Sequence, residues 1–279
     1  MTGKQKTLLG ASIFFLLAFC YMLVKPLLAH WVSLPGIPGG PYGKAVPLFG
    51  FTFFYLAYVR GWKSTLYFAL FMLVFAWGCE DLSIHTGFPY GHYYYSNQLG
   101  FKLDQAPVML GVLYFGLLVI GPLFTSNLLA EGTFFGNTKN LKRLLFASFI
   151  GSILVAGFDM LIDPVDATRL GEWVWTINHH TGYYGIPYIN YLGYLICFTP
   201  IFFIYGLINR KVNAQPQGPV TLPIAALPLL FYFLNFVLYG LAAPGGVDLV
   251  GCFTIVFPLT LTADKLLKYF SQNKTATVG

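Results

Sequence analysis

Charged residues are scarce in this sequence. Only 9% of the 279 residues are charged, whereas 57% are hydrophobic, and the mean hydropathy is +0.67. A soluble domain carries about 25% charged residues, so this composition excludes an ordinary soluble protein. The apolar runs are continuous rather than alternating, and several reach the roughly 20 residues that a membrane-spanning helix needs. We therefore predict an all-α fold, a polytopic transmembrane helical bundle that forms one integral membrane domain over residues 1–279.

Several motifs are also absent. The four cysteines lie within or at the ends of apolar runs, without metal-ligand spacing, and the five histidines form no His-x-x-His or His-x-x-x-His pair. The sequence has no Gly-x-Gly-x-x-Gly nucleotide motif, and no lysine lies at the centre of an apolar run. The basic residues lie at the ends of these runs, where they act as orientation signals. We therefore predict no metal site, no cofactor and no nucleic-acid partner.

The hydrophobic runs predict eight spans. With the N-terminus inside, 12 basic residues fall on inside segments and three or four on outside segments, so the positive-inside rule places both termini in the cytoplasm. A seven-span arrangement would scramble this alternation. Residues 270–279 are predicted to be a disordered tail. The predicted spans are residues 8–29, 45–60, 63–81, 106–129, 142–162, 187–208, 220–241 and 248–268.

The acidic residues have the opposite bias, with eight of the ten on or near the predicted outer side. Glu80 and Asp81 are adjacent at the end of the third span. Asp159 and Asp163 are four residues apart, so they share one face of the fifth span. A carboxylate inside a span costs free energy, and such residues mark functional sites. We therefore predict a composite site near the outer face of the membrane.

Aromatic residues accompany these carboxylates on both sides of the fourth and fifth spans. Tyr93 to Tyr95 follow a Gly-Pro turn, and Trp173 and Trp175 precede the sixth span. Aromatic faces stabilise cations, and a desolvated carboxyl group keeps its proton more readily than one in water. Such a site suits protonation of an alkene to a tertiary carbocation. Water captures this cation in a hydratase, whereas a second double bond captures it in a cyclase.

Four motifs follow one another along the chain, namely Glu80 with Thr86–Tyr95, Asp159–Pro164, Trp173–Trp175 and Tyr184–Tyr194. In this order they resemble the integral-membrane carotenoid biosynthesis family, which includes γ-carotene (lycopene) 1′-hydratases, also called 1′-hydroxylases, and bisanhydrobacterioruberin hydratases. The resemblance covers residues 45–270, and Tyr90 and Tyr194 stand where many members have Phe and Trp. It implies addition of water to the terminal 1,2 double bond of an acyclic carotenoid, without a redox cofactor.

The expected partners are therefore a carotenoid such as lycopene or γ-carotene, water, and other enzymes of the carotenoid pathway. The expected location is a bacterial or archaeal cell membrane. Two alternatives stay open, namely a carotenoid cyclase and a non-enzymatic membrane protein that binds carotenoid or lipid.

The roles of individual residues are inferred from their types and positions. Asp159 or Glu80 is expected to protonate the alkene, and Asp163 or Asp81 to orient water or accept its proton. Asn190 and His92 are expected to hold that water. The expected lining of the pocket around the reacting end group is Tyr93, Tyr95, Trp173, Trp175 and Tyr184.

Overall fold

The computed structural model describes residues 1–28, 35, 43, 45–132, 138–176 and 182–275. Within these residues, seven helical segments are long and apolar enough to cross a membrane, which confirms the predicted all-α membrane bundle. They are α1 (Gly3–Leu28), α3 (Trp62–Thr86), α4 (Met109–Leu113) with η3 (Tyr114–Leu118) and α5 (Ile120–Glu131), α6 (Leu141–Asp163) with η4 (Pro164–Arg169), α7 (Tyr188–Lys211), α8 (Leu222–Ala242), and α9 (Val247–Gly251) with η6 (Cys252–Val256) and α10 (Phe257–Thr275).

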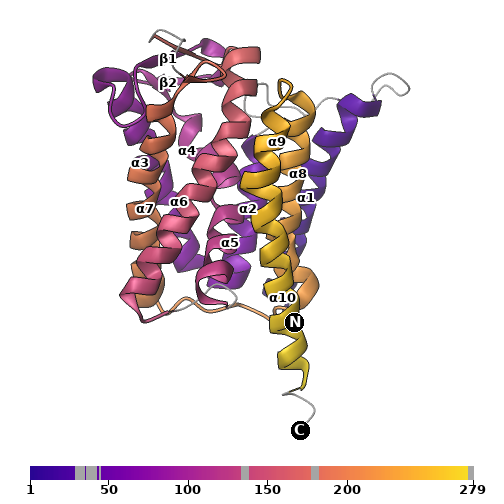
Figure 1. Ribbon diagram of the computed structural model, residues 1–279. Helices are drawn as coiled ribbons and strands as arrows, with labels where there is room; N and C mark the ends of the chain where they lie inside the picture. The colour runs from indigo at the N-terminus through magenta and orange to yellow at the C-terminus, as the bar shows by residue number, and fades with distance from the viewer. Residues whose placement is uncertain (29–34, 36–42, 44, 133–137, 177–181, 276–279) are drawn as a thin grey trace.

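The predicted second span is helix α2 (Ala45–Arg60), which is apolar but only 16 residues long. At 1.5 Å per residue it is about 24 Å long, which is less than the roughly 30 Å of the hydrocarbon core. Twelve of its residues are buried, so it is an interior helix of the bundle. Both chain ends lie at one end of the bundle and strands β1 and β2 at the other (Figure 1). The side of the membrane that holds the termini stays a prediction.

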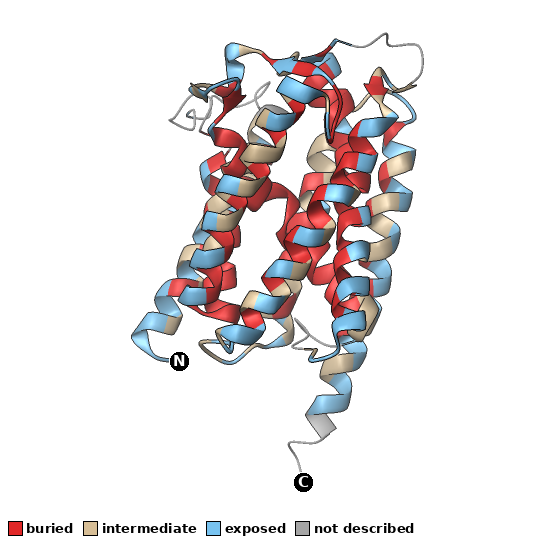
Figure 2. Ribbon diagram, turned by 90° about the vertical axis from the view of Figure 1, so that its left-hand side faces the viewer, coloured by how far each residue is buried: buried red, intermediate tan, exposed pale blue. Residues whose placement is uncertain are grey.

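Most of the long helices have a buried face and an exposed face (Figure 2), whereas the segment Met109–Glu131 is buried over most of its length. In α3 the exposed side chains include Leu66, Leu70 and Val74, which recur every four residues as expected for a face that meets lipid. Met72 and Ala76 lie on the buried face, and the next residue on that face is Glu80. Helix α10 continues to Thr275, so residues 270–275 of the predicted tail are helical, and residues 276–279 lie outside the described residues.

Three short two-stranded ribbons cover the end of the bundle away from the termini (Figure 1). These ribbons were not predicted from the sequence, because strands of two or three residues are too short to show a period-two pattern. In the longest ribbon Tyr93 pairs with Trp175 and Tyr95 with Trp173. The ribbons are β1 (Tyr93–Tyr95) with β4 (Trp173–Trp175), β2 (Lys102–Leu103) with β3 (Ala106–Pro107), and β5 (Gly182–Tyr183) with β6 (Ile186–Pro187).

Two glycines allow the turn between α3 and β1 to form and to pack closely against α7. Gly87 ends α3 with φ +76°, a left-handed conformation that favours glycine, and its N–H donates to the Ser83 carbonyl at 2.8 Å. Gly193 lies where α7 approaches this turn, and a Cβ there would be 2.7 Å from the Pro89 carbonyl oxygen. The close approach brings the Tyr90 ring onto the Tyr194 ring, with 5.1 Å between the centroids.

Candidate active site

A cavity of about 220 Å³ lies between the helices and the β1–β4 ribbon. It is smaller than the roughly 300–1,000 Å³ that holds a complete drug-sized ligand, so it can take one end of a long molecule. Its apolar side is formed by Leu48, Met109, Leu110, Leu113, Leu117, Leu118 and Ile162. Its polar and aromatic side is formed by Glu80, Tyr93, Tyr95, Tyr114, Asp159, Asp163, Asp166, Glu172, Trp173, Trp175, Asn190, Tyr194 and Tyr239.

Glu80 accepts hydrogen bonds from three tyrosine hydroxyl groups. Tyr95 donates to Oε2 at 2.6 Å, Tyr93 donates to the same oxygen, and Tyr114 donates to Oε1. Tyr93 and Tyr95 are alternate residues of β1, so both face inward, while Tyr94 between them is 53% exposed. Burial first, and the nearby Glu80 second, raise the pKa of Tyr93 and Tyr95 well above the usual tyrosine range. Both hydroxyl groups therefore remain donors at neutral pH.

Asp159 and Asp163 form a second carboxyl site on α6. Asn190 of α7 donates from Nδ2 to Asp159 Oδ2 at 2.8 Å and to Asp163 Oδ2 at 2.7 Å. Tyr194, one turn further along α7, donates to Asp159 Oδ1 at 2.8 Å. The i, i+4 spacing on both helices brings these four side chains together. One amide nitrogen therefore holds the two carboxyl groups side by side.

Two tyrosines join the two carboxyl sites. The Tyr114 hydroxyl, which donates to Glu80, lies 3.2 Å from the Tyr194 hydroxyl, which donates to Asp159. Tyr114 begins η3, a stretch of π-helix between α4 and α5, and such stretches are frequent at functional sites. The side chains of Glu80, Tyr114, Tyr194 and Asp159 thus lie in series within hydrogen-bonding distance of one another. The contact between the two hydroxyl groups becomes a hydrogen bond when Tyr114 turns its proton from Glu80 to Tyr194.

No cation neutralises these carboxyl groups within the part of the chain that the structure describes. Glu80, Asp159 and Asp163 are each 2% exposed, and the ion pairs formed by described residues involve other acids. A buried charge is costly unless it is paired or hydrogen-bonded. Hydroxyl and amide donors therefore take the place of water around these three acids, and they can hold and pass protons without a counter-ion.

The aromatic residues predicted at the site line the same cavity. The Tyr93 and Trp175 rings lie 4.7 Å apart between centroids, and the Tyr95 and Trp173 rings lie 6.0 Å apart. All four face the carboxyl groups from the β1–β4 ribbon. An electron-rich wall of this kind stabilises a cation formed nearby.

Three predicted site residues lie away from the cavity. Asp81 follows Glu80 on α3 and points about 100° away from it around the helix, toward His85. His92 lies two residues before Tyr94 in the extended chain, so its side chain points to the same exposed side. Tyr184 occupies the β5–β6 turn with φ +50°, and its hydroxyl donates to the Gly245 carbonyl at 2.7 Å.

Some lining residues were not among the predicted site residues. Tyr194 was noted only as a departure from the family pattern, although its position four residues after Asn190 would have placed it on the same face of α7. Tyr114 is a single hydroxyl group in an apolar run, which gives little signal. Tyr239 of α8 donates to Asp166 at 3.2 Å. Asp166 and Glu172 are two of the eight acidic residues predicted on or near the outer side, and no role was predicted for them.

Comparison with known proteins decides the family. The family described as "Carotenoid biosynthesis protein" matches residues 42–258, which is more than half of the chain. The chain belongs to this family. One relative is the bisanhydrobacterioruberin hydratase of Haloarcula japonica. It is 26% identical over 201 residues, which cover 68% of this chain and 64% of the relative. The chain therefore spans just under two thirds of that relative's length. No solved structure matches the chain.

Proposed function

We propose that this member of the family is a carotenoid hydratase, a hydro-lyase that adds water across the terminal 1,2 double bond of an acyclic carotenoid end group. The observation that carries the proposal is the cavity itself, in which two buried carboxyl sites connected by Tyr114 and Tyr194 face an apolar and aromatic wall. The family and the name of the Haloarcula relative support the same class of reaction.

The Asp159–Asp163 pair is the proton donor in this proposal. Two carboxyl groups held side by side by Asn190 cannot both carry a charge in a buried site, so the pair retains one proton. That proton is transferred to C2 of the terminal double bond, and the π electrons form the new C–H bond. The tertiary carbocation that results at C1 lies against the aromatic wall.

Water completes the reaction by attacking C1. The oxygen forms the C–O bond with a lone pair and then loses one proton, which gives the tertiary alcohol. Glu80 is the acceptor on the far side of the cavity, and the hydroxyl groups of Tyr114 and Tyr194 connect it to Asp159. Once protonated, Glu80 can donate to the Tyr114 hydroxyl, which then donates to Tyr194, while Tyr194 donates to Asp159. If each hydroxyl group along this route passes on its own proton and receives another, the donor regains the proton it gave. The reaction therefore consumes one alkene and one water and needs no net acid.

The size of the cavity fits this assignment. At about 220 Å³ it accommodates an end group with water, and the rest of a carotenoid must extend outside it toward lipid. We propose that the enzyme works in the cell membrane on lycopene, γ-carotene or a similar pigment, beside other enzymes of the pathway. The exposed apolar faces of the helices support a substrate drawn from the bilayer.

Expression in a host that makes lycopene or γ-carotene tests the proposal. We expect pigments that are heavier by one water per reacting end, detected by chromatography and mass spectrometry. A cyclase would change retention without changing mass, and a carrier would leave the extracted pigments unchanged, so either result would refute the proposal. Asp159→Asn, expressed in the same membranes at the same level, is the matched inactive variant.

A further inference from the structure

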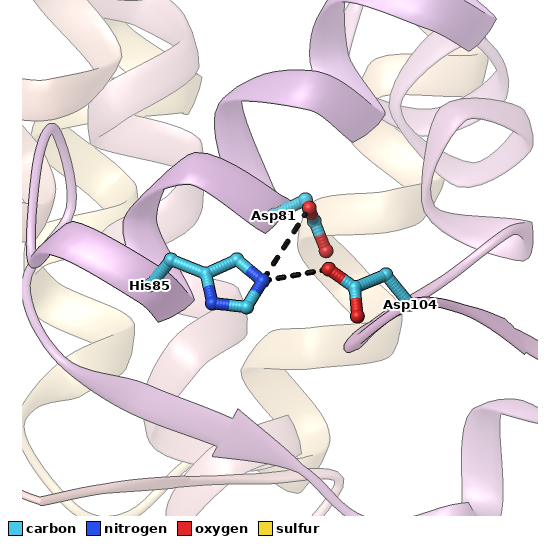
Figure 3. A group of neighbouring side chains, drawn as sticks. All are labelled: Asp81, His85 and Asp104. Carbon is cyan, nitrogen blue, oxygen red and sulfur yellow. Dashed lines mark hydrogen bonds and ion pairs between the residues drawn. The ribbon is translucent and has the colours of Figure 1, made fainter.

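A second cluster of ionisable side chains lies outside the cavity, at the end of the bundle that carries the ribbons (Figure 3). Asp81 and His85 are one turn apart near the end of α3, and Asp104 comes from the turn between β2 and β3. His85 Nε2 is 2.7 Å from Asp104 Oδ2 and 3.8 Å from Asp81 Oδ2. One ligand atom from each of the three residues lies within 4.8 Å of the other two.

The local backbone holds this arrangement in place. Asp104 has φ +54°, a left-handed conformation that is uncommon outside glycine but tolerated by Asp and Asn. The next residue, Gln105, donates its backbone N–H to Asp81 Oδ1 at 3.3 Å. Trp77, one turn before Asp81, donates its indole N–H to the Ala106 carbonyl at 3.2 Å. The two residues that follow Asp104 thus fix the hairpin to α3, and the Asp104 carboxylate is directed at His85.

We propose that Asp81, His85 and Asp104 bind a divalent metal ion of the Zn²⁺ class. Zn²⁺ binds imidazole nitrogen and carboxylate oxygen at about 2.0–2.2 Å, and tetrahedral ligands at that distance lie roughly 3.4 Å from one another. The separations of 2.7 and 3.8 Å from His85 lie on either side of this value, and the two carboxylate oxygens lie within 4.8 Å of each other, so side-chain rotations bring all three atoms into range. Three protein ligands leave the fourth position for water.

The donor set and its exposure distinguish this site from other assignments. Ca²⁺ and Mg²⁺ prefer all-oxygen sites, whereas imidazole with carboxylates suits Zn²⁺ and its neighbours. The side chains of His85 and Asp104 are 50% and 53% exposed, so an ion reaches them from water, while Asp81 is 17% exposed. With the imidazole neutral, two carboxylates give the cluster a formal charge of −2. The alternative is an exposed His–Asp ion pair, which contributes little to stability and binds no ion.

No metal site was predicted from the sequence, because the histidines form no closely spaced pair and the cysteines show no metal-ligand spacing. Asp81 and His85 alone offer two ligands, and Asp104 is 19 residues further along the chain than His85. A bound ion would fix the β2–β3 hairpin to α3. The hairpin leads directly into α4 and η3, which carry Met109, Leu110 and Tyr114 of the cavity lining. The metal would therefore stabilise one wall of the cavity from outside, without contact with the substrate.

Direct metal binding to the purified full chain tests this proposal. The protein is prepared in detergent with its affinity tag removed, treated with a chelator, and titrated with Zn²⁺ by calorimetry and equilibrium dialysis. We expect one equivalent per chain. Co²⁺ in place of Zn²⁺ should give the visible absorption bands of a site with a nitrogen ligand. Zn²⁺ should also raise the thermal unfolding temperature, because a ligand that binds only the folded state stabilises it.

Variants of the three ligands assign the site. Asp104→Asn is the most informative, because Asn keeps the shape of the side chain and tolerates the left-handed backbone, so the protein should fold. We expect it and His85→Ala to weaken Zn²⁺ binding by more than about 10-fold, since even changes to residues behind the ligands cost 10–100-fold. They should also abolish the thermal shift.

Two matched controls change exposed residues of the same types. His92→Ala removes another exposed histidine, and Asp248→Asn removes an exposed carboxylate near the start of α9. Both should bind Zn²⁺ like the unaltered protein. The proposal is overturned if the unaltered chain shows no saturable Zn²⁺ binding, or if Asp104→Asn and His85→Ala bind as tightly as the controls. Gel filtration and the helical circular dichroism signal confirm that each variant is folded.

Discussion

The replacement of Asp159 by Asn is the sharpest test of the proposed chemistry. It removes the ionisable proton and keeps the volume of the side chain. General acid catalysis contributes about 10²–10⁴-fold in rate, which corresponds to roughly 3–5 kcal/mol of barrier at 1.36 kcal/mol per tenfold. We therefore expect hydrated product to fall by at least about 100-fold at equal protein level.

The structural cost of this variant is smaller and separable. The oxygen of Asn at position 159 can still accept from Tyr194, but its amide would face Nδ2 of Asn190, which now donates to Asp159 Oδ2. Loss of one buried hydrogen bond costs about 1–3 kcal/mol, which is less than the 5–15 kcal/mol that holds a typical protein folded. The variant should therefore accumulate in the membrane and elute from gel filtration as the unaltered protein does.

The assay follows the transferred proton as well as the product. Cells or membranes that make the acyclic carotenoid are incubated in D₂O, and we expect one deuterium on C2 of each hydrated end, because the donor exchanges with solvent before it protonates the alkene. Asp248→Asn, an exposed carboxylate outside the cavity, should hydrate the pigment normally. Conversion by Asp159→Asn at the rate of the unaltered protein, with deuterium at C2, would refute the assignment of Asp159 as part of the donor.

Three further variants test the surroundings of the donor. Tyr194→Phe keeps the ring but interrupts the hydroxyl chain, so pigment analysis should show a loss of product, whereas Tyr94→Phe on the exposed side of β1 should show none. Glu80→Gln replaces an acceptor of three hydroxyl groups by an amide with one oxygen, so both the amount of product and the thermal stability in detergent should fall. The loss of stability should be about 1–3 kcal/mol for each hydroxyl group left without an acceptor. Gly193→Ala places a Cβ against the Pro89 carbonyl, and overpacking of about 1–3 kcal/mol should lower the unfolding temperature; an unchanged temperature would contradict the close approach.

The helices and much of the site could be predicted because both follow from the local spacing of residues in the sequence. Hydrophobic runs located most span ends to within a few residues. The larger differences are that α1 begins at Gly3, five residues before the predicted start, that α3 continues to Thr86, five residues past the predicted end, and that α10 continues to Thr275, seven residues past it. Asp159 and Asp163 share a face because they are four residues apart. Asn190 was found because it is polar near the start of a span, and the structure brings it to both carboxyl groups.

The remainder depends on contacts between segments that are distant in the sequence. Tyr93 and Tyr95 face Glu80 because β1 pairs with β4, and that pairing joins residues about 80 positions apart. Tyr114 reaches Glu80 from a π-helical stretch that no local pattern marks. Asp81 was grouped with Glu80 because the predicted span ended at residue 81, which left the orientation of the two side chains undefined.

Helix α3 therefore divides an adjacent carboxylate pair between two environments. Glu80 faces the cavity with its three tyrosines, while Asp81 lies about 100° around the helix beside His85 and Asp104. If the cavity carries hydration and the outer cluster carries metal, the two functions must be separable by substitution. Glu80→Gln should lose conversion and still bind Zn²⁺, whereas Asp104→Asn should lose Zn²⁺ and keep the chemistry, with lower thermal stability. Loss of both properties in both variants would mean instead that the end of α3 acts as a single unit.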